Sequence, residues 1–151
     1  MSPDKDPIKY PDHKESERQT QVEEPFIAWD LPKASARISR GLASEIILII
    51  QERLGISNKV LSELLLISPR TLDRRKKEDI LPADESERTF RIARLTDLAS
   101  DVLGSMDKAS TWFKTPNFAL GNKKPIELIK TEPGARLVER TLNQIRHGMP
   151  V

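Results

Sequence analysis

The densest group of chemically active side chains in this sequence is basic. The stretch SPRTLDRRKK, residues 68–77, holds five lysine or arginine side chains in ten positions, although the formal net charge of the chain is only +2. Lysine and arginine bind phosphate groups, and arginine can also form two hydrogen bonds with the O6 and N7 acceptors of guanine. The cluster therefore indicates binding of a nucleic acid rather than catalysis.

The side chains that usually perform catalysis or bind metal are scarce. The sequence contains no cysteine and only two histidines, His13 and His147, which lie near opposite ends of the chain. An acid-base or metal site needs several such groups on one scaffold. The sequence also contains no glycine-rich phosphate loop and no nucleophile motif. We therefore expect a protein that is not an enzyme and that requires no metal or other cofactor.

Helical spacing around the basic cluster predicts a helix-turn-helix. Apolar residues recur every three or four positions in the two segments before the cluster, at Ile46, Ile47, Ile50 and Leu54 and then at Val60, Leu61, Leu64 and Leu65. Ser68 suits the N-cap of a third helix, and Pro69 suits its first position, where a missing N–H costs nothing. This helix is expected to run to about Lys77. In a helix-turn-helix, the second helix of the pair enters the DNA major groove.

The basic side chains of this third helix are predicted to share one face. With Leu72 directed at the core, rotation of about 100° per residue places Arg70, Arg74 and Lys77 on the opposite side. Arg70 and Arg74 are the candidates for reading bases. The candidates for phosphate contacts are Ser68, Thr71, Arg75, Lys76 and Lys77. The alternative is an ordinary solvated basic face.

An acidic stretch follows the basic helix and limits the affinity that we expect for DNA. Five acidic residues lie between Glu78 and Glu87. They would repel a phosphate backbone approaching from that side, so one copy of the chain should bind modestly. A homodimer on a two-fold DNA site is the expected remedy, formed through the long helix or the C-terminal helices.

The rest of the sequence predicts an all-α fold with three parts. Residues 1–34 hold five prolines and eight acidic against five basic residues, so they are expected to form a flexible arm. Within the arm, the apolar piece PFIAWDLP, residues 25–32, is expected to cover the chain's own core, with docking on a partner as the alternative. Residues 35–106 are assigned to the helix-turn-helix domain with a long linking helix, whose apolar stripe runs through Ile92, Leu95, Ala99, Val102, Leu103 and Met106. Residues 107–151 form a further helical domain.

One segment of that last domain resembles a known family. Residues 109–148 read ASTWFKTPNFALGNKKPIELIKTEPGARLVERTLNQIRHG. Trp112 and Phe113 before TPN, then ALG, then KPIELI, then a glycine and a final helix ending IRHG make this segment similar to the C-terminal region of the Xre/MbcA/ParS antitoxins. The preceding helix-turn-helix, which is Xre/Cro-like, fits the same family. The resemblance covers about residues 40–151.

The resemblance implies a bacterial antitoxin of a type II toxin-antitoxin system with two activities. Its C-terminal region would block a RES-domain toxin that degrades NAD, and its helix-turn-helix would repress the promoter of its own operon. In this family the C-terminal end lies at the mouth of the toxin's NAD pocket. The residues that correspond here are Arg146, His147, Gly148, Met149, Pro150 and Val151. The rival interpretations are a stand-alone transcription regulator, a protein-interaction module that never binds DNA, and a frayed basic tail without function.

The N-terminus and the apolar runs indicate the compartment. The first residues carry acids and prolines rather than the basic and apolar regions of a secretory signal. The longest apolar run, IILII at residues 46–50, is far shorter than the roughly 20 residues that span a bilayer. We therefore expect a cytoplasmic protein without a membrane segment.

Overall fold

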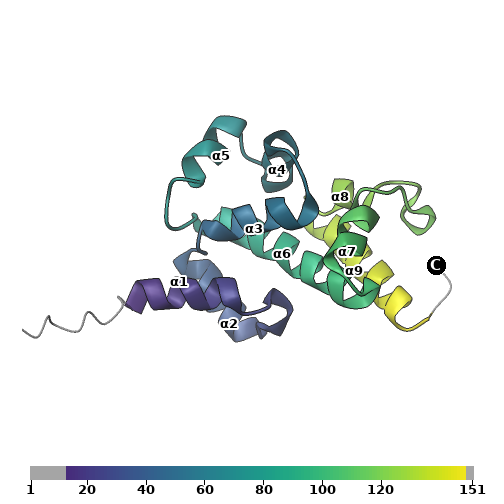
Figure 1. Ribbon diagram of the computed structural model, residues 1–151, viewed down its shortest axis with the longest axis horizontal. Helices are drawn as coiled ribbons and strands as arrows, with labels where there is room; N and C mark the ends of the chain where they lie inside the picture. Colours follow the sequence, from purple (N-terminus) through teal and green to yellow (C-terminus); the bar gives the residue numbers. More distant parts are fainter. Residues whose placement is uncertain (1–12, 149–151) are drawn as a thin grey trace, which may run out of the picture.

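Helices account for most of residues 13–148, the part of the chain that the computed structural model describes (Figure 1). In chain order they are α1 (His13–Glu23), η1 (Phe26–Ala28), α2 (Leu31–Arg40), α3 (Glu45–Leu54), α4 (Asn58–Leu65), α5 (Pro69–Arg75), α6 (Ala83–Leu103), α7 (Met106–Phe113), η2 (Phe118–Leu120), α8 (Pro125–Leu128) and α9 (Glu132–Arg146). Within the described residues the only β pairing consists of two isolated bridges. The predicted all-α fold is confirmed.

The long helix α6 is the spine against which the other helices pack. It contacts α2, η1 and α3, which precede it in the chain, and α7 and α9, which follow it (Figure 1). Its core face is apolar, with Ile92, Leu95 and Ala99 buried. The stripe was expected to continue through Met106, but α6 ends before Gly104, whose φ of 98° only glycine adopts readily, and Met106 begins α7.

The described part of the predicted arm, residues 13–34, is largely helical and packs against the body. Phe26 and Trp29 are buried, and the Trp29 ring stacks on Phe90 of α6 at 5.3 Å between centroids. The Phe26 N–H also donates to Asp97 Oδ2 of α6 at 2.6 Å. The piece PFIAWDLP therefore covers the chain's own core, as expected. Residues 1–12 of the predicted arm lie outside the described residues.

The prolines of this segment predicted a flexible arm, but proline here starts a helix rather than breaking one. Pro32 occupies the first turn of α2, where its missing N–H has no intrahelical partner to lose. Asp30 is the N-cap, and its Oδ1 accepts from the Lys33 N–H at 2.8 Å. These are ordinary helix-start signals, and they could have been recognised in the sequence.

A close contact between two loops closes the helix-turn-helix unit. The Leu81 N–H donates to the Leu42 carbonyl at 2.9 Å, and Ala43 and Ile80 form an isolated bridge. Gly41 makes this approach possible, because its φ is 93° and a Cβ there would lie 2.4 Å from the Leu81 carbonyl oxygen. The segment from Leu42 to Leu81, which carries α3, α4 and α5, is thereby joined at its base and fixed against the start of α6.

Candidate functional sites

Local capping signals produce the two helices of the predicted helix-turn-helix. Ser57 caps α4 by accepting the Val60 N–H at 3.2 Å. Ser68 caps α5 by accepting the Thr71 N–H at 3.1 Å, and Pro69 is the first helical residue. Only three residues separate the helices, and the buried Leu72 packs α5 against the unit. Helix α5 ends at Arg75, two residues before the expected end at Lys77.

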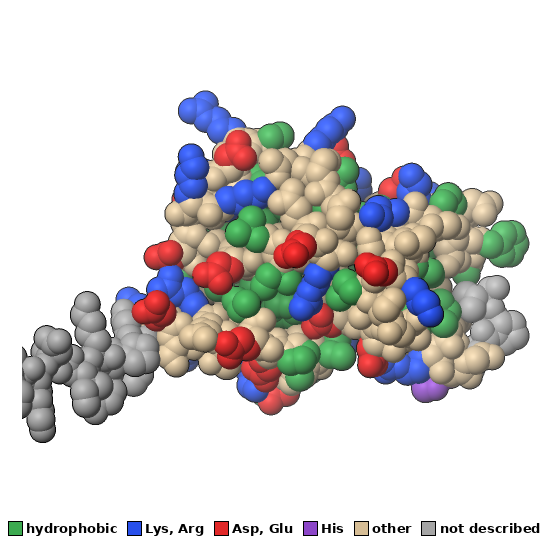
Figure 2. Space-filling model, viewed as in Figure 1, with side chains coloured by type: hydrophobic (Ala, Val, Ile, Leu, Met, Phe, Trp, Pro, Cys, Tyr) green, Lys and Arg blue, Asp and Glu red, His purple; other side chains and the backbone are tan. Residues whose placement is uncertain are grey.

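The face of α5 opposite Leu72 presents positive charge to solvent. The side chains of Arg70, in α5, and of Lys77, two residues past its end, are exposed and make no hydrogen bond or ion pair with any other described residue. Arg74 is 64% exposed and only approaches Glu78, at 3.7 Å. Figure 2 shows Lys and Arg side chains projecting from the edge of the molecule that α4 and α5 form. Such a face suits a polyanion.

Two of the predicted phosphate-binding residues are held in contacts within the protein. Arg75 donates from Nε and Nη2 to the two carboxylate oxygens of Glu85, at 2.5 and 2.9 Å, and it also pairs with Glu78. The hydrogen bond to Glu85 is the main reason that the pKa of Arg75 is raised. Lys76 Nζ donates to Gln51 at 2.9 Å and to Asn58 at 2.5 Å. Both side chains thus fasten α5 to neighbouring elements.

One exposed cation beside this face was not predicted. Lys59 lies in the first turn of α4, and it has no ion pair within the described part of the chain. The sequence signal was available, because Lys59 lies two residues after Ser57, the N-cap of α4. A lysine beside a helix N-terminus suits a phosphate group.

Helix α9 forms the second candidate site. Val138 and Leu142 are fully buried on its inner side. Gly134 lets its first turn lie against α8, since a Cβ there would be 1.9 Å from the Leu128 carbonyl oxygen. The helix is thus fixed from its first turn to its end, where Arg146 donates to Asp101 of α6.

The predicted toxin-contacting residues begin at that end. Arg146, His147 and Gly148 are exposed, and the His147 N–H closes the helix on the Asn143 carbonyl at 3.1 Å. Met149, Pro150 and Val151 lie outside the described residues.

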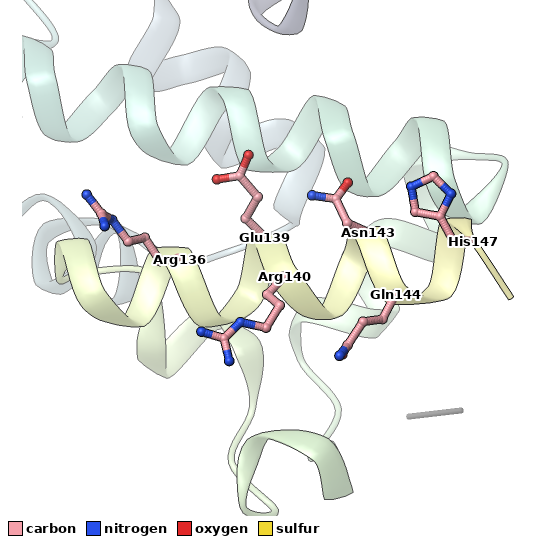
Figure 3. A pocket seen from close by; sticks show the side chains of 6 residues that line it. All are labelled: Arg136, Glu139, Arg140, Asn143, Gln144 and His147. Carbon is pink, nitrogen blue, oxygen red and sulfur yellow. The ribbon is translucent and has the colours of Figure 1, made fainter. Parts of the chain in front are cut away.

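A shallow groove runs along the outer side of α9. Its lining residues come from one helix and are Arg136, Glu139, Arg140, Asn143, Gln144 and His147 (Figure 3). Glu139 is held by Arg94 of α6 at 2.8 Å, whereas Arg140 has no ion pair within residues 13–148. Sequence reasoning missed Arg140 and Gln144, although their spacing of four residues, offset from the buried Val138 and Leu142, marks them as one outer face.

Two other properties bear on the kind of protein. No helix of the described residues has the length and apolar character that crossing a membrane requires. Within the same residues, no group of three or more His, Cys, Asp or Glu side chains could hold a metal ion.

The fold and its two surfaces define a class: a helix-turn-helix protein that carries a second helical domain on a shared spine helix. Comparison with known families identifies both parts. Residues 33–94 match the family model of the antitoxin Xre-like helix-turn-helix domain. Residues 98–148 match that of the antitoxin Xre/MbcA/ParS C-terminal toxin-binding domain.

Individual relatives agree with these matches. The antitoxin Xre of Pseudomonas putida is 32% identical over 131 residues, which are 86% of this chain and 80% of that protein. The Prs ADP-ribosylating antitoxin of a Sphingobium species is 26% identical over 121 residues, 74% of this chain and 76% of that protein. The chain therefore belongs to the Xre/MbcA/ParS family of antitoxins, which are not enzymes, and its C-terminal domain binds a toxin.

A solved structure shares the fold. A chain in the crystal structure of the Mycobacterium tuberculosis MbcT–MbcA toxin-antitoxin complex superimposes with a TM-score of 0.57 at 24% sequence identity. The match covers 72% of this chain and 96% of that chain.

Proposed function

We propose that this antitoxin neutralises a RES-domain toxin that degrades NAD, by blocking its active site with the C-terminal region from Arg146 to Val151. The observation that carries the proposal is the arrangement at the end of α9. Arg146, His147 and Gly148 are exposed there, inside the domain matched as toxin-binding, and His147 also lines the groove along the outer side of α9. This end is open to a partner protein.

The same chain is proposed to repress its own operon by binding promoter DNA in the cytoplasm. Three cations support this role: Arg70, whose side chain has no partner among the described residues, and the loosely held Arg74 project from the second helix of a helix-turn-helix, and Lys77, also without a side-chain partner there, follows directly after it. Ser68 and Thr71 lie at the start of that helix and can contact a phosphate. Binding as a homodimer on a two-fold site would add the affinity that a single copy lacks.

Expression of the neighbouring gene tests the toxin proposal. If its product alone stops growth and lowers intracellular NAD, and co-expression of this chain reverses both, the proposal stands. ADP-ribosyl transfer also consumes NAD, so labelling of cellular proteins with ADP-ribose should be measured in the same cultures. If the neighbouring product is harmless, the remaining candidate function is that of a stand-alone transcription regulator.

A C-terminal truncation tests whether the residues after Arg146 help to block the toxin. A chain that ends at Arg146 should fold and bind DNA as before, because it loses only the two backbone hydrogen bonds that close α9, while the buried Val138 and Leu142 and the Arg146 contact with Asp101 remain. It should block the toxin less well. Unchanged blocking would rule out the placement of the tail in the active site.

A further inference from the structure

One aromatic side chain of the C-terminal domain faces solvent. Phe118, in η2, is 83% exposed, whereas each of the other described aromatic side chains is buried or half-buried. Phe118 lies in the segment TPNFALGNKK, and neither of the functions described above makes use of it. An aromatic ring of this size gains a large free energy when it leaves water.

The exposure of Phe118 results from a well-defined loop. The Asn117 N–H donates to the Lys123 carbonyl at 3.0 Å, and the Asn117 carbonyl accepts from the Asn122 N–H at 2.9 Å. The Asn117 side chain also accepts the N–H of Ala119, at 2.8 Å. Two residues beyond Phe118, Leu120 is buried in the core. These hydrogen bonds fix the base of the loop, and the loop holds the phenyl ring of Phe118 toward solvent.

The surroundings of Phe118 indicate the kind of surface that it fits. Lys123, whose carbonyl accepts the Asn117 N–H, lies at the base of the loop, and its side chain is exposed and without an ion pair among the described residues; Lys114 Nζ instead lies near Gly55 at the end of α3. Element η2 packs against α9, and the loop lies at the same end of the molecule as the C-terminal end of α9 (Figure 1). Figure 2 shows a hydrophobic side chain projecting from this end. A partner would need an apolar pocket with acidic side chains around it.

We propose that Phe118 is an anchor that inserts into an apolar, acid-rimmed pocket of the toxin, next to the site reached by the C-terminal tail. The proposal deepens the proposed function, because it rests on the toxin-binding role of residues 98–148. The toxin is the occupant that the position favours, since the loop belongs to the toxin-binding domain and packs on α9. Anchors of this kind are rigid aromatic side chains that become fully desolvated in the complex.

The test compares two equally exposed apolar residues. Phe118→Ala is measured against Leu31→Ala, since Leu31 is 86% exposed and lies outside the toxin-binding domain. The full-length chain and the product of the neighbouring RES-domain gene are titrated by calorimetry, and circular dichroism checks folding. Phe118→Ala should weaken binding about 30-fold, the loss typical of a hot spot, while Leu31→Ala leaves it unchanged.

Lys123, at the base of the loop, gives a second, independent readout. Lys123→Glu should slow association with the toxin, and the difference from wild type should shrink as salt is added. DNA binding should be the same for Phe118→Ala and wild type, because the helix-turn-helix is untouched.

The outcomes separate failure of this inference from failure of the proposed function. If the wild-type chain binds the RES-domain protein and Phe118→Ala binds it equally well, the anchor is overturned and the proposed function survives. If Phe118→Ala instead loses self-association without losing toxin affinity, the ring contacts a second copy and the anchor is also overturned. If the wild-type chain does not bind that protein, both proposals fail.

Discussion

The outer face of α5 and the end formed by η2 and α9 expose different chemistry. The side chains of Arg70 on α5 and of Lys77 just past its end project into solvent with no partner among the described residues. At the other end, two of the three arginines of α9, Arg136 and Arg146, are paired with acidic side chains, and the most exposed large hydrophobic side chain is Phe118. Both surfaces carry cations without an ion pair among the described residues, Arg140 and Lys123 at the η2 and α9 end, but only that end also offers an exposed aromatic ring.

This difference corresponds to the two kinds of partner. Free cations gain from a phosphate backbone, because neutralising phosphates releases condensed counterions and sequence is read by a few arginines. A protein surface is recognised mainly through desolvated aromatic and apolar anchors. We infer that charge determines affinity on the α5 face and that shape determines it at the η2 and α9 end. Mutations can separate these two cases.

The largest effect on stability is expected from Arg75, the cation of α5 whose side chain is held in ion pairs within the protein. Its side chain is 13% exposed, and its partner Glu85 is 9% exposed. Arg75→Gln leaves a buried carboxylate without its main partner, which should cost about 3 kcal/mol of unfolding free energy. DNA affinity should fall because α5 loses its fastening to α6, but the slope of affinity against salt should stay the same.

Urea denaturation and DNA titrations at several salt concentrations check this prediction. Glu85→Gln is the matched variant, since it breaks the same pair from the other side. It should lower DNA affinity without removing any cation. A smaller salt slope for Arg75→Gln would instead mean that Arg75 contacts a phosphate, as the sequence suggested.

The second-largest effect is expected from a substitution at Gly134, which should alter only the stability and the toxin binding of the C-terminal domain. Gly134→Ala would normally stabilise a helix by up to about 1 kcal/mol. Here the new Cβ would meet the Leu128 carbonyl, so we expect a net loss of about 2 kcal/mol from overpacking, with weaker toxin binding. Denaturant melts and toxin titrations measure both, and Leu137→Ala, on the exposed side of α9, serves as control. A more stable Gly134→Ala protein would contradict the close contact between α8 and α9.

Local signals in the sequence predicted much of this molecule. Ser68, Pro69 and Leu72 lie within five positions, and they define the cap, the start and the buried side of α5 without reference to other elements. The pair between Arg75 and Glu85 could not be found in this way. It joins residues ten positions apart across a loop whose path depends on tertiary contacts.

Solvent exposure was the least predictable property of the sites. Phe118 and Leu120 are both apolar and two residues apart, yet only Leu120 is buried. The turn around Asn117, rather than either side chain, decides which of them faces the core. In the N-terminal segment, the burial of Trp29 depends on the opposing Phe90, more than 60 positions along the chain.

The third prediction separates base reading from phosphate binding on α5. Arg70→Gln should cost about 1–3 kcal/mol of binding to the operator and relax sequence preference, whereas Lys77→Gln should weaken all sequences alike and reduce the salt slope by about one. Titrations of operator and scrambled DNA at several salt concentrations provide both values. Identical behaviour of the two variants would show that α5 reads no base through Arg70.

The smallest effect lies in the N-terminal segment, whose charges connect helices rather than binding a partner. Glu24 accepts from Lys33 at 2.9 Å and from Arg37 at 3.0 Å, and these hydrogen bonds hold the pKa of its carboxyl below the ordinary value of 4.5. Arg37 also lies over the ring of Trp29, at 4.3 Å from its centroid. The ionised carboxylate thus fastens α2 to the turn after α1.

The sign of the resulting pH dependence follows from that lowered pKa. The folded state binds the proton on Glu24 less readily than the unfolded state, so the contribution is complete above the ordinary value and is lost as the pH falls through the folded value. Glu24→Gln should therefore melt below wild type at pH 7. The gap in melting temperature should narrow once the pH drops below 4.5, because protonation then removes the same carboxylate from wild type. A gap that is equal at neutral and acidic pH would show that packing of the Glu24 side chain, rather than its charge, joins α2 to the body.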